Sequence, residues 1–385
     1  MKPRLLSEKV LQVYRKYPIL TITGPRQSGK TTLSRMLFPQ KKYVTLENPD
    51  NREFAQVDPL GFLKEYENGA IIDEIQRCPD LASYLQGEVD KNNSPGRFIL
   101  TGSGQLELMQ SVSQSLAGRT AILRLLPFSL EETDSFVERR DSNEVLFTGF
   151  YPRIFDQNLD PQDYYSFYID TYLQRDVRMI LNIQDLSRFE IFLKLCAGRT
   201  GQILNYNELG TASGVSHNTI KSWINVLEAS FIIKLIRPYY KNLKLRLIKS
   251  PKLYFLDTGL VCSLLGIKNS EHIKNHPLKG AIFETFIVSE IIKNRFNKGL
   301  KEDLYFLRDS KGHEIDLVFD SGMTCDLCEI KSSMTINKDF FKNIQYFSKM
   351  ELPIKNKYII YGGEEKRNQL KVEILPWDRI REIEY

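Results

Sequence analysis

Cysteine and long apolar runs are both scarce in this sequence. Its five cysteines stand at positions 78, 196, 262, 325 and 328 of 385 residues. An odd and scattered set of this kind does not make a disulfide framework, and it suits a reducing cytoplasm. No uncharged apolar run approaches the length of a bilayer-spanning helix, and residues 1–18 lack the apolar core of a signal peptide. We therefore expect a cytoplasmic protein without a membrane partner.

A strong excess of charge is also absent. The formal net charge is +5, and 42% hydrophobic with 26% charged residues is the composition of an ordinary globular protein. A chain of 385 residues is long for one core, so we expect two or three domains. The distribution of charge along the chain is more informative than its sum.

The pattern Gly-x-x-x-x-Gly-Lys-Thr follows a short β-branched run and precedes a helix-like segment. Gly24 and Gly29 allow the backbone to turn with its N–H groups inward, Lys30 can reach the β- and γ-phosphates, and Thr31 can ligate Mg²⁺. The dipole of the following helix favours the same anion. The predicted nucleotide-binding residues are Gly24, Pro25, Arg26, Gln27, Ser28, Gly29, Lys30, Thr31 and Thr32.

A second apolar run, residues 70–72, ends in the adjacent carboxylates Asp73 and Glu74. Together with the phosphate-binding loop, this pattern is typical of a Walker B element. We expect Asp73 to hold Mg²⁺ through water and Glu74 to polarise the attacking water. The alternative is a solvated acidic pair at the end of a strand.

A third apolar run, residues 97–103, ends in small polar residues at the sheet edge where a parallel sheet binds its ligand. Thr101 is the first candidate for a residue that senses the γ-phosphate, and Ser103 is the second. Strands that alternate with helical segments predict a three-layer α/β sheet with parallel strands. This segment has no guanine-type Asn-Lys-x-Asp motif, which favours ATP.

Aromatic residues recur at helical spacing through residues 161–183 and predict a packed core. From residue 207 the sequence has helix-turn-helix form, with Gly214 at the turn and Ser216 capping the second helix. That helix would turn Ile220, Trp223, Ile224 and Leu227 inward. It would present His217, Asn218, Thr219, Lys221 and Ser222, which are residue types that contact DNA grooves or phosphates.

Residues 229–256 contain no acidic residue, and their seven positive charges exceed the net charge of +5 of the whole chain. A basic β-hairpin wing that also carries Tyr239 and Tyr240 favours a nucleic-acid backbone. The alternative is a protein-contact lid whose basic side chains are solvated or docked on the ATPase. Sequence-specific reading is not expected, because the second helix presents no outward Arg or Gln. The predicted nucleic-acid contacts are His217, Asn218, Lys221, Lys241, Lys244, Arg246 and Lys249.

Four charged residues of the C-terminal third lie on faces of a predicted helix and two predicted strands that could meet. Glu284 lies on the apolar face of a predicted helix, Asp316 lies in an alternating strand, and Glu329 and Lys331 share one face of the next strand. This is the constellation of PD-(D/E)XK nucleases. Asp316 and Glu329 would hold Mg²⁺ or Mn²⁺, Lys331 would orient or activate water, and Glu284 would complete the site. The alternative is a nuclease-like domain that binds without cutting.

Several motifs together resemble the prokaryotic AAA-type ATPases that carry a C-terminal domain of unknown function 4143. They lie at residues 24–33, 73–77, 98–103, 149–152, 175–177 and 257–260. The resemblance covers nearly the whole chain and implies an AAA+ core, a winged-helix segment and a tail similar to restriction-type nucleases. We therefore expect an AAA+ domain at 1–155, a helical connector at 156–200, a winged helix at 201–272 and a nuclease-like domain at 273–385.

Ring-type ATPases use an arginine from a neighbouring subunit to stabilise charge on the transferring phosphate. Arg119 is the first candidate for this role and Arg153 is the second, and either would require a homo-oligomer. The alternative for both is an ordinary surface pair with a carboxylate.

The sequence thus predicts an α/β protein. A P-loop three-layer parallel-sheet AAA+ domain would be followed by an α+β winged helix and an α/β restriction-nuclease-like domain. We expect an ATP-hydrolysing, Mg²⁺-dependent protein that acts on DNA with a metal-dependent nuclease-like domain. The alternative function is a nucleotide-switched regulator that binds DNA or protein without nuclease activity.

Overall fold

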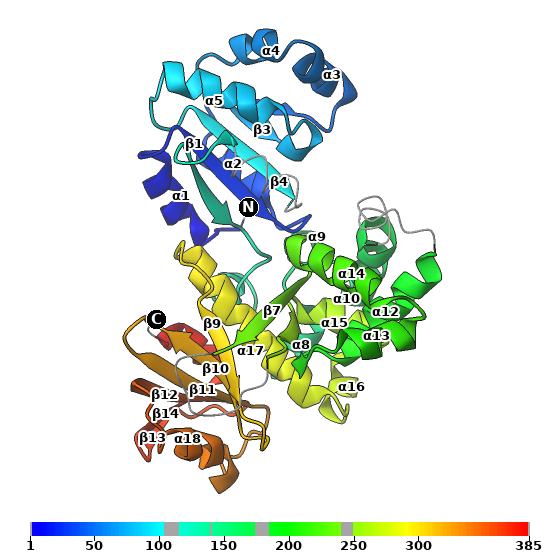
Figure 1. Cartoon of the computed structure of the whole chain (residues 1–385), viewed down its shortest axis with the longest axis vertical. Coiled ribbons are helices and arrows are strands. Elements are labelled where there is room, and N and C mark those ends of the chain that lie inside the picture. The colour runs from blue at the N-terminus through cyan, green and yellow to red at the C-terminus, as the bar shows by residue number, and fades with distance from the viewer. Residues whose placement is uncertain (1, 104–114, 139–140, 174–184, 240–248, 384–385) are drawn as a thin grey trace.

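The computed structural model describes residues 2–103, 115–138, 141–173, 185–239 and 249–383. Two sheets organise these residues (Figure 1). The N-terminal sheet and its helices lie at one end of the long axis, the C-terminal strands lie at the other end, and a group of helices lies to one side. No helix in these ranges has the length and apolar character needed to cross a membrane.

The N-terminal sheet has five strands in the order β2-β3-β4-β1-β5, and all its pairings are parallel. β1, β3 and β4 are buried along their whole length, as expected for parallel strands covered by helices on both faces. The predicted P-loop α/β sheet is confirmed. Its strands are β1 (Ile19–Gly24), β2 (Lys42–Thr45), β3 (Ala70–Asp73), β4 (Phe98–Ser103) and β5 (Thr120–Arg124), and its helices are α1 (Leu6–Tyr14), α2 (Lys30–Leu37), α3 (Pro49–Val57), α4 (Pro59–Glu65) and α5 (Leu81–Lys91), with a 3₁₀ turn η1 (Ile75–Arg77).

Short helices follow the N-terminal sheet and pack through tyrosines. Tyr164, Tyr168 and Tyr172 are buried, which confirms the predicted aromatic core, whereas Phe167 is exposed. Tyr151 and Tyr165 are buried as well, and the Tyr151 hydroxyl lies 2.9 Å from that of Tyr168. The elements are α7 (Leu130–Asp134), α8 (Ser142–Thr148), α9 (Pro152–Gln157), α10 (Pro161–Tyr168), the π-helical turn η2 (Ile169–Leu173) and α12 (Leu186–Gly198).

The predicted helix-turn-helix segment forms two consecutive helices. Gly214 ends the first with a positive φ of 71°, a conformation that glycine adopts without strain. Ser216 caps the second by accepting a hydrogen bond from the Thr219 backbone N–H at 3.1 Å. Ile220, Ile224 and Leu227 are buried as expected. The elements are α13 (Tyr206–Ser213) and α14 (His217–Ala229), with strands β6 (Gln202–Ile203), β7 (Ile233–Pro238) and β8 (Lys252–Phe255).

The second sheet has nine strands in the order β13-β14-β12-β11-β10-β9-β7-β8-β6. β7 pairs in parallel with β9, so one sheet crosses the predicted domain boundary between residues 272 and 273. Its C-terminal strands are β9 (Leu304–Arg308), β10 (Glu314–Asp320), β11 (Cys325–Lys331), β12 (Ile354–Tyr361), β13 (Arg367–Gln369) and β14 (Val372–Pro376). The accompanying helices are α15 (Thr258–Leu264), α16 (Ser270–Lys274), α17 (Lys279–Asn297) and α18 (Lys342–Phe347), with 3₁₀ turns η3 (Lys338–Phe341) and η4 (Trp377–Glu382).

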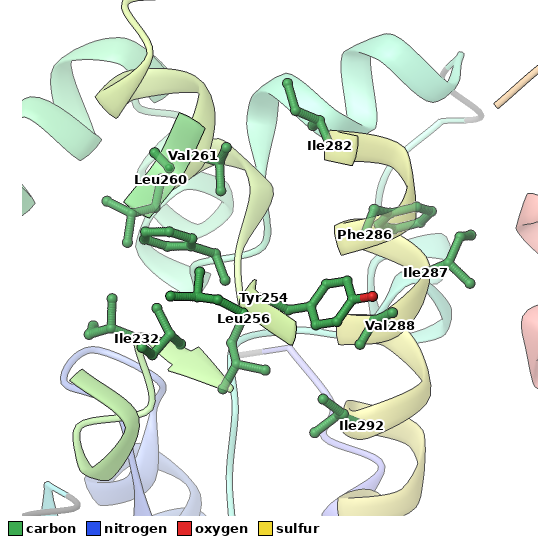
Figure 2. Packing of buried hydrophobic residues seen from close by; sticks show 14 of the residues in the cluster. Ile232, Tyr254, Leu256, Leu260, Val261, Ile282, Phe286, Ile287, Val288 and Ile292 are labelled. Carbon is green, nitrogen blue, oxygen red and sulfur yellow. The ribbon is translucent and has the colours of Figure 1, made fainter. Parts of the chain in front are cut away.

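Helix α17 is the centre of the largest apolar core. Ile282, Phe286 and Val288 of this helix belong to one buried cluster with Tyr254 of β8 and Leu260 of α15, and Val288 lies beside the Tyr254 ring (Figure 2). The ring of Phe286 stacks on that of Phe150, with their centroids 5.8 Å apart. This core contains residues from Leu126 to Ile383. The helical segment, the helix-turn-helix and the C-terminal strands therefore share one core, and the C-terminal strands bury a further cluster with η3 and α18.

Candidate functional site

The loop between β1 and α2 adopts a backbone that depends on glycine. A Cβ on Gly24 would lie 2.0 Å from the backbone oxygen of Leu125, a contact that no side chain can make. Gly29 has a φ of 94°, in the left-handed region that favours glycine. Both glycines of the predicted motif are therefore required by the turn itself.

Lys30 begins α2 and folds back over its own loop. Its Nζ donates hydrogen bonds to the backbone oxygens of Gly24, at 3.1 Å, and Pro25, at 2.7 Å. Lys30 is only 6% exposed. Burial lowers its pKa to about 8, although the charges of Glu74 and Asp73 act in the opposite direction. The ammonium group is thus held at the loop, where a bound phosphate would lie.

Thr31 and Asp73, the predicted ligands of Mg²⁺, contact each other. Thr31 Oγ1 donates to Asp73 and lies 3.1 Å from each carboxylate oxygen, and Thr101 also donates to Asp73. A hydroxyl and a carboxylate are hard oxygen donors of the kind that Mg²⁺ prefers, so Thr31 and Asp73 fit this ion. Tyr43 also donates to Asp73, at 2.8 Å, and burial raises the pKa of Tyr43 to about 12. The sequence reasoning did not identify Tyr43, because only the β2–β3 pairing brings it there.

Glu74 follows the same strand and faces the lysine. Burial raises the pKa of its carboxyl group, and the Lys30 charge partly opposes that effect. The Gln76 side-chain amide donates to Glu74 and also to Ser103 Oγ, the latter at 3.0 Å. Gln76, which the sequence reasoning also missed, therefore orients the carboxylate and links it to the end of β4.

A pocket of about 410 Å³ opens over this loop. It is lined by the P-loop residues Arg26, Gln27, Gly29, Lys30, Thr31 and Thr32, by Lys2, Arg4, Leu33, Met36, Glu47, Glu74 and Phe128, and by Pro152, Arg153, Asp156 and Gln157 of α9. Five of these side chains are basic and three are acidic, so the pocket favours an anion. Phe128, Leu33, Met36 and Pro152 give it an apolar side as well.

The two arginine candidates have different surroundings. Arg119 binds both carboxylate oxygens of Asp90, at 2.6 and 2.8 Å, on the protein surface, and it is not among the residues that line the pocket. This contact is the surface ion pair that we gave as the alternative to a role of Arg119 at a neighbouring subunit. Arg153 lines the pocket beside the P-loop of its own chain. Within one chain, Arg153 is therefore better placed than Arg119 to meet a nucleotide.

Arg4 ties the P-loop to the segment that follows β5. Its guanidinium donates to the backbone oxygens of Ser28, at 2.7 Å, and Leu126, at 2.6 Å, and to Glu132 Oε1, at 2.9 Å. Nothing in the local sequence around Arg4 signals this role. Three partners from separate segments hold the loop in place, which is the support that a preorganised binding site needs.

The P-loop also contacts the helical segment. Tyr164 of α10 donates to the Gln27 side-chain oxygen at 2.8 Å, and the Arg26 guanidinium lies 5.4 Å from the ring centre of Tyr172. Arg175 and Asp176, which belong to one of the motifs that resemble the family, lie outside the described residues.

The predicted nucleic-acid contacts are only partly described. His217, Asn218 and Lys221 are exposed along α14, and Lys249 is exposed before β8. Lys241, Lys244 and Arg246, together with Tyr240, lie outside the described residues. Two other members of the basic stretch are not free surface charges: Lys234 pairs with Glu228 and Glu302, and Lys252 is buried. The basic stretch is therefore not a single exposed face.

The predicted nuclease-like residues come together from three elements. Glu284 lies on α17, Asp316 on β10, and Glu329 and Lys331 on β11. Lys331 Nζ lies 2.7 Å from Glu329 Oε2 and 3.8 Å from Asp316 Oδ2. Burial, followed by the Asp316 charge, raises the pKa of Glu329.

The same cluster contains a second lysine that the sequence reasoning placed on the basic wing. Lys252 Nζ lies 3.0 Å from Glu284 Oε1 and 4.0 Å from Asp316 Oδ1, and it also contacts Glu314. Among the residues that the structure describes, no group of three Asp, Glu, His or Cys side chains is arranged to hold a metal ion. In this arrangement the carboxylates of Glu284, Asp316 and Glu329 are ion-paired with Lys252 and Lys331, while Glu329 Oε1 is buried without a hydrogen-bond partner.

The Lys30 pKa predicts how ATP binding depends on pH. A bound triphosphate would favour the charged ammonium and raise its pKa above about 8. Above that pH the complex would hold a proton that the free protein has lost, so ATP binding should take up protons and its affinity should fall as pH rises. Calorimetry in buffers of different ionisation enthalpy measures this uptake. Binding heats of the wild type that are independent of the buffer above that pH would contradict the assignment.

Three family models match consecutive parts of the chain. Residues 16–133 match a model described as AAA domain, residues 139–271 match domain of unknown function 8612, and residues 279–380 match domain of unknown function 4143. Among curated proteins, two uncharacterized proteins, one from Mycobacterium bovis and one from Mycobacterium tuberculosis, are each 28% identical over 365 residues. That alignment covers 94% of this chain and 80% of each relative.

Similar solved structures include a Walker-type ATPase of Pyrococcus abyssi, with 14% identity and a TM-score of 0.43 over 67% of this chain and 94% of that one. A single-residue variant of RuvB from Thermotoga maritima matches with 17% identity and a TM-score of 0.29, over 60% of this chain and 88% of that one. AMPPCP-bound DnaA from Aquifex aeolicus matches with 13% identity and a TM-score of 0.31, over 58% of this chain and 86% of that one.

The match over residues 16–133 covers the P-loop side of the pocket, whereas the N-terminal residues and α9 that line its other side lie outside the match. The match agrees with the geometry of Lys30, Thr31, Asp73 and Glu74. The second and third matches meet close to the start of α17. Residues 16–133 are thus similar to AAA domains and carry a P-loop site for ATP, and residues 279–380 are similar to domain of unknown function 4143.

Proposed function

We propose that this protein hydrolyses ATP with Mg²⁺ and uses the nucleotide cycle to change how its helix-turn-helix and C-terminal segments engage DNA. The observation that carries the proposal is the convergence of Lys30, Thr31 and Glu74 at one pocket, with Asp73 hydrogen-bonded to Thr31. An activated water, a phosphate cradle and an ion site are the parts that phosphoryl transfer to water requires.

Each residue at the pocket has a role in this reaction. Lys30 and the P-loop backbone bind the β- and γ-phosphates, and Arg26 and Arg153 add positive charge at the pocket. Thr31 and Asp73 would hold Mg²⁺, which neutralises charge on the transferring phosphate. Glu74 orients the attacking water and accepts its proton, and Gln76 keeps the Glu74 carboxylate in position.

The pocket also supports coupling to the rest of the chain. It is lined by the P-loop and by α9, so a bound nucleotide would contact both. Asp257, after β8, accepts hydrogen bonds from the Phe150 backbone N–H at 2.9 Å and the Tyr165 hydroxyl at 2.6 Å. These bonds join the segment before α9 and the helix α10 to the strand that follows the helix-turn-helix. Occupancy of the pocket can therefore bias the position of that region.

The DNA contact is proposed for the exposed side of α14. His217, Asn218 and Lys221 lie there together, and Lys249 lies near the start of β8. These side chains suit phosphate contacts, which bind DNA without reading its sequence. A protein-contact lid is the other interpretation of the same surface.

The proposal is tested by the ATPase rate as a function of added single-stranded DNA, double-stranded DNA and RNA. We expect DNA to raise the rate. Changing Lys221 and Lys249 together to Glu should weaken the DNA effect and lower the salt slope of DNA binding by about 1 per lysine, while the rate without DNA is unchanged. A DNA response that is the same in the double variant would favour the protein-contact interpretation.

Metal-dependent DNA cleavage by the C-terminal segment is the activity that the sequence predicts, and it is the alternative to binding without cutting. The convergence of Asp316, Glu329 and Lys331 favours it, whereas the ion pairs of Lys252 oppose it. The proposal assigns no cleavage step to this segment. Plasmid nicking with Mg²⁺ or Mn²⁺ that is lost in Lys331→Ala would establish the alternative.

A further inference from the structure

Lys252 is a lysine in the interior of a sheet. Its backbone belongs to β8, which pairs with β6 through Ile203 and with β7 through Ile236. A strand with a partner on each side is fixed in place, and the Lys252 residue is only 2% exposed. The ammonium group is therefore shielded from solvent in this structure. A buried charge of this kind requires compensation by nearby opposite charge.

That compensation comes from elements outside the helix-turn-helix segment. Lys252 Nζ lies 3.0 Å from Glu284 of α17, contacts Glu314 of β10, and lies 4.0 Å from Asp316. The same oxygen of Glu284 accepts a hydrogen bond from Tyr254 at 2.6 Å. Lys252 thus links β8 to the helix and the strand that carry the predicted nuclease-like residues.

Every carboxylate of the cluster already contacts a basic side chain. Glu284, Glu314 and Asp316 contact Lys252, Glu314 also pairs with Arg308 at 2.9 Å, and Glu329 pairs with Lys331 at 2.7 Å. A divalent ion such as Mg²⁺ or Mn²⁺ needs several free oxygen ligands around one point. Here the ammonium group of Lys252 occupies the space between Glu284, Glu314 and Asp316.

We propose that the ammonium group of Lys252 takes the place of a divalent metal ion within the carboxylate cluster. It keeps such an ion out and connects β8, α17 and β10 through ion pairs. Removal of the Lys252 ammonium should open a divalent-metal site made from Glu284, Asp316 and Glu329. The inference depends on the positions of these side chains and is independent of ATP hydrolysis.

The rival arrangement is a metal ion bound between Asp316 and Glu329 while Lys252 stays in place. These two carboxylates lie close enough that the Asp316 charge contributes to the raised pKa of Glu329. A test must therefore include the unaltered protein as well as variants of Lys252.

The experiment measures Mn²⁺ bound per chain by electron paramagnetic resonance, with the full-length, nucleotide-free protein. We compare the wild type with Glu329→Gln, Lys252→Met and the double variant. The wild type and Glu329→Gln should bind the same number of ions. Lys252→Met should bind one more ion, and the double variant should lose that ion. Lys252→Arg keeps a cation at the same place and should gain no site.

Two results would overturn the inference. One is a Mn²⁺ site in the wild type that Glu329→Gln removes, because the cluster would then hold metal despite Lys252. The other is a folded Lys252→Met protein, judged by circular dichroism, that gains no site. If Lys252→Met does not fold, the comparison of the wild type with Glu329→Gln still decides: equal Mn²⁺ binding supports the inference and a lost site refutes it.

Discussion

Replacing Glu74 by Gln is expected to lower the ATP turnover rate by about 100-fold or more while ATP binding is retained. Glutamine has the same shape as glutamate but cannot accept a proton from the attacking water. The Gln76 bond and the half-buried position of Glu74 in the pocket beside Lys30 indicate a carboxylate that is placed for chemistry rather than for solubility. Phosphate release under steady-state conditions measures the rate, and equilibrium titration with ATP measures the binding.

The exposed Glu53 on α3 provides a matched control for this change. It is the same residue type in the same domain and does not line the pocket, so Glu53→Gln should turn over ATP at the wild-type rate. An unchanged rate in Glu74→Gln would remove the assigned base. A loss of ATP affinity equal to the loss of rate would make Glu74 a binding residue instead.

Replacing Glu290 by Gln is expected to lower the free energy of unfolding by about 3–5 kcal/mol. Glu290 Oε1 lies 2.8 Å from Lys293 Nζ, and both side chains are almost completely buried in α17. The other oxygen of Glu290 accepts the Leu130 backbone N–H at 2.7 Å, so the residue also fixes the start of α7. The substitution leaves the Lys293 charge without its ion-pair partner inside the shared core, and denaturant titration measures the cost.

A double variant separates the loss of the pair from the loss of packing. Glu290→Gln combined with Lys293→Met removes both charges, and the free energy of unfolding should recover in part. If Lys293→Met lowers the free energy of unfolding in the Glu290→Gln background by as much as it does in the wild type, the two residues do not act as a pair.

The nucleotide site was accessible to sequence reasoning because its main parts are local. Gly24, Gly29, Lys30 and Thr31 lie within one turn and the first residues of one helix, and their geometry follows from glycine chemistry. The contact of Thr31 with Asp73 required only that β1 and β3 belong to one parallel sheet, which the alternation of strands and helices already predicted.

Contacts that depend on distant segments were not accessible in the same way. Arg4 and Tyr43 reach the site through tertiary packing and carry no motif. The choice between Arg119 and Arg153 depended on which of them faces the pocket, and spacing along the chain does not determine that.

Lys252 shows why a charge count can mislead. The sequence from 229 to 256 was treated as one basic surface, whereas the structure buries Lys252 and pairs Lys234. One signal was present: Lys252 and Tyr254 lie two residues apart in a strand, so they share a face, and a buried tyrosine beside the lysine indicates the inner face. The parallel pairing of β7 with β9, which joins two predicted domains into one sheet, had no local signal.

The most direct test of the central claim is an equilibrium titration of the nucleotide-free protein with a non-hydrolysable ATP analogue and Mg²⁺. The wild type should bind one nucleotide per chain with saturation. Lys30→Met, which removes the ammonium held at the loop, should show no measurable binding while its circular dichroism is unchanged. No affinity of the wild type for adenine nucleotides, or equal affinity in the variant, would contradict the account.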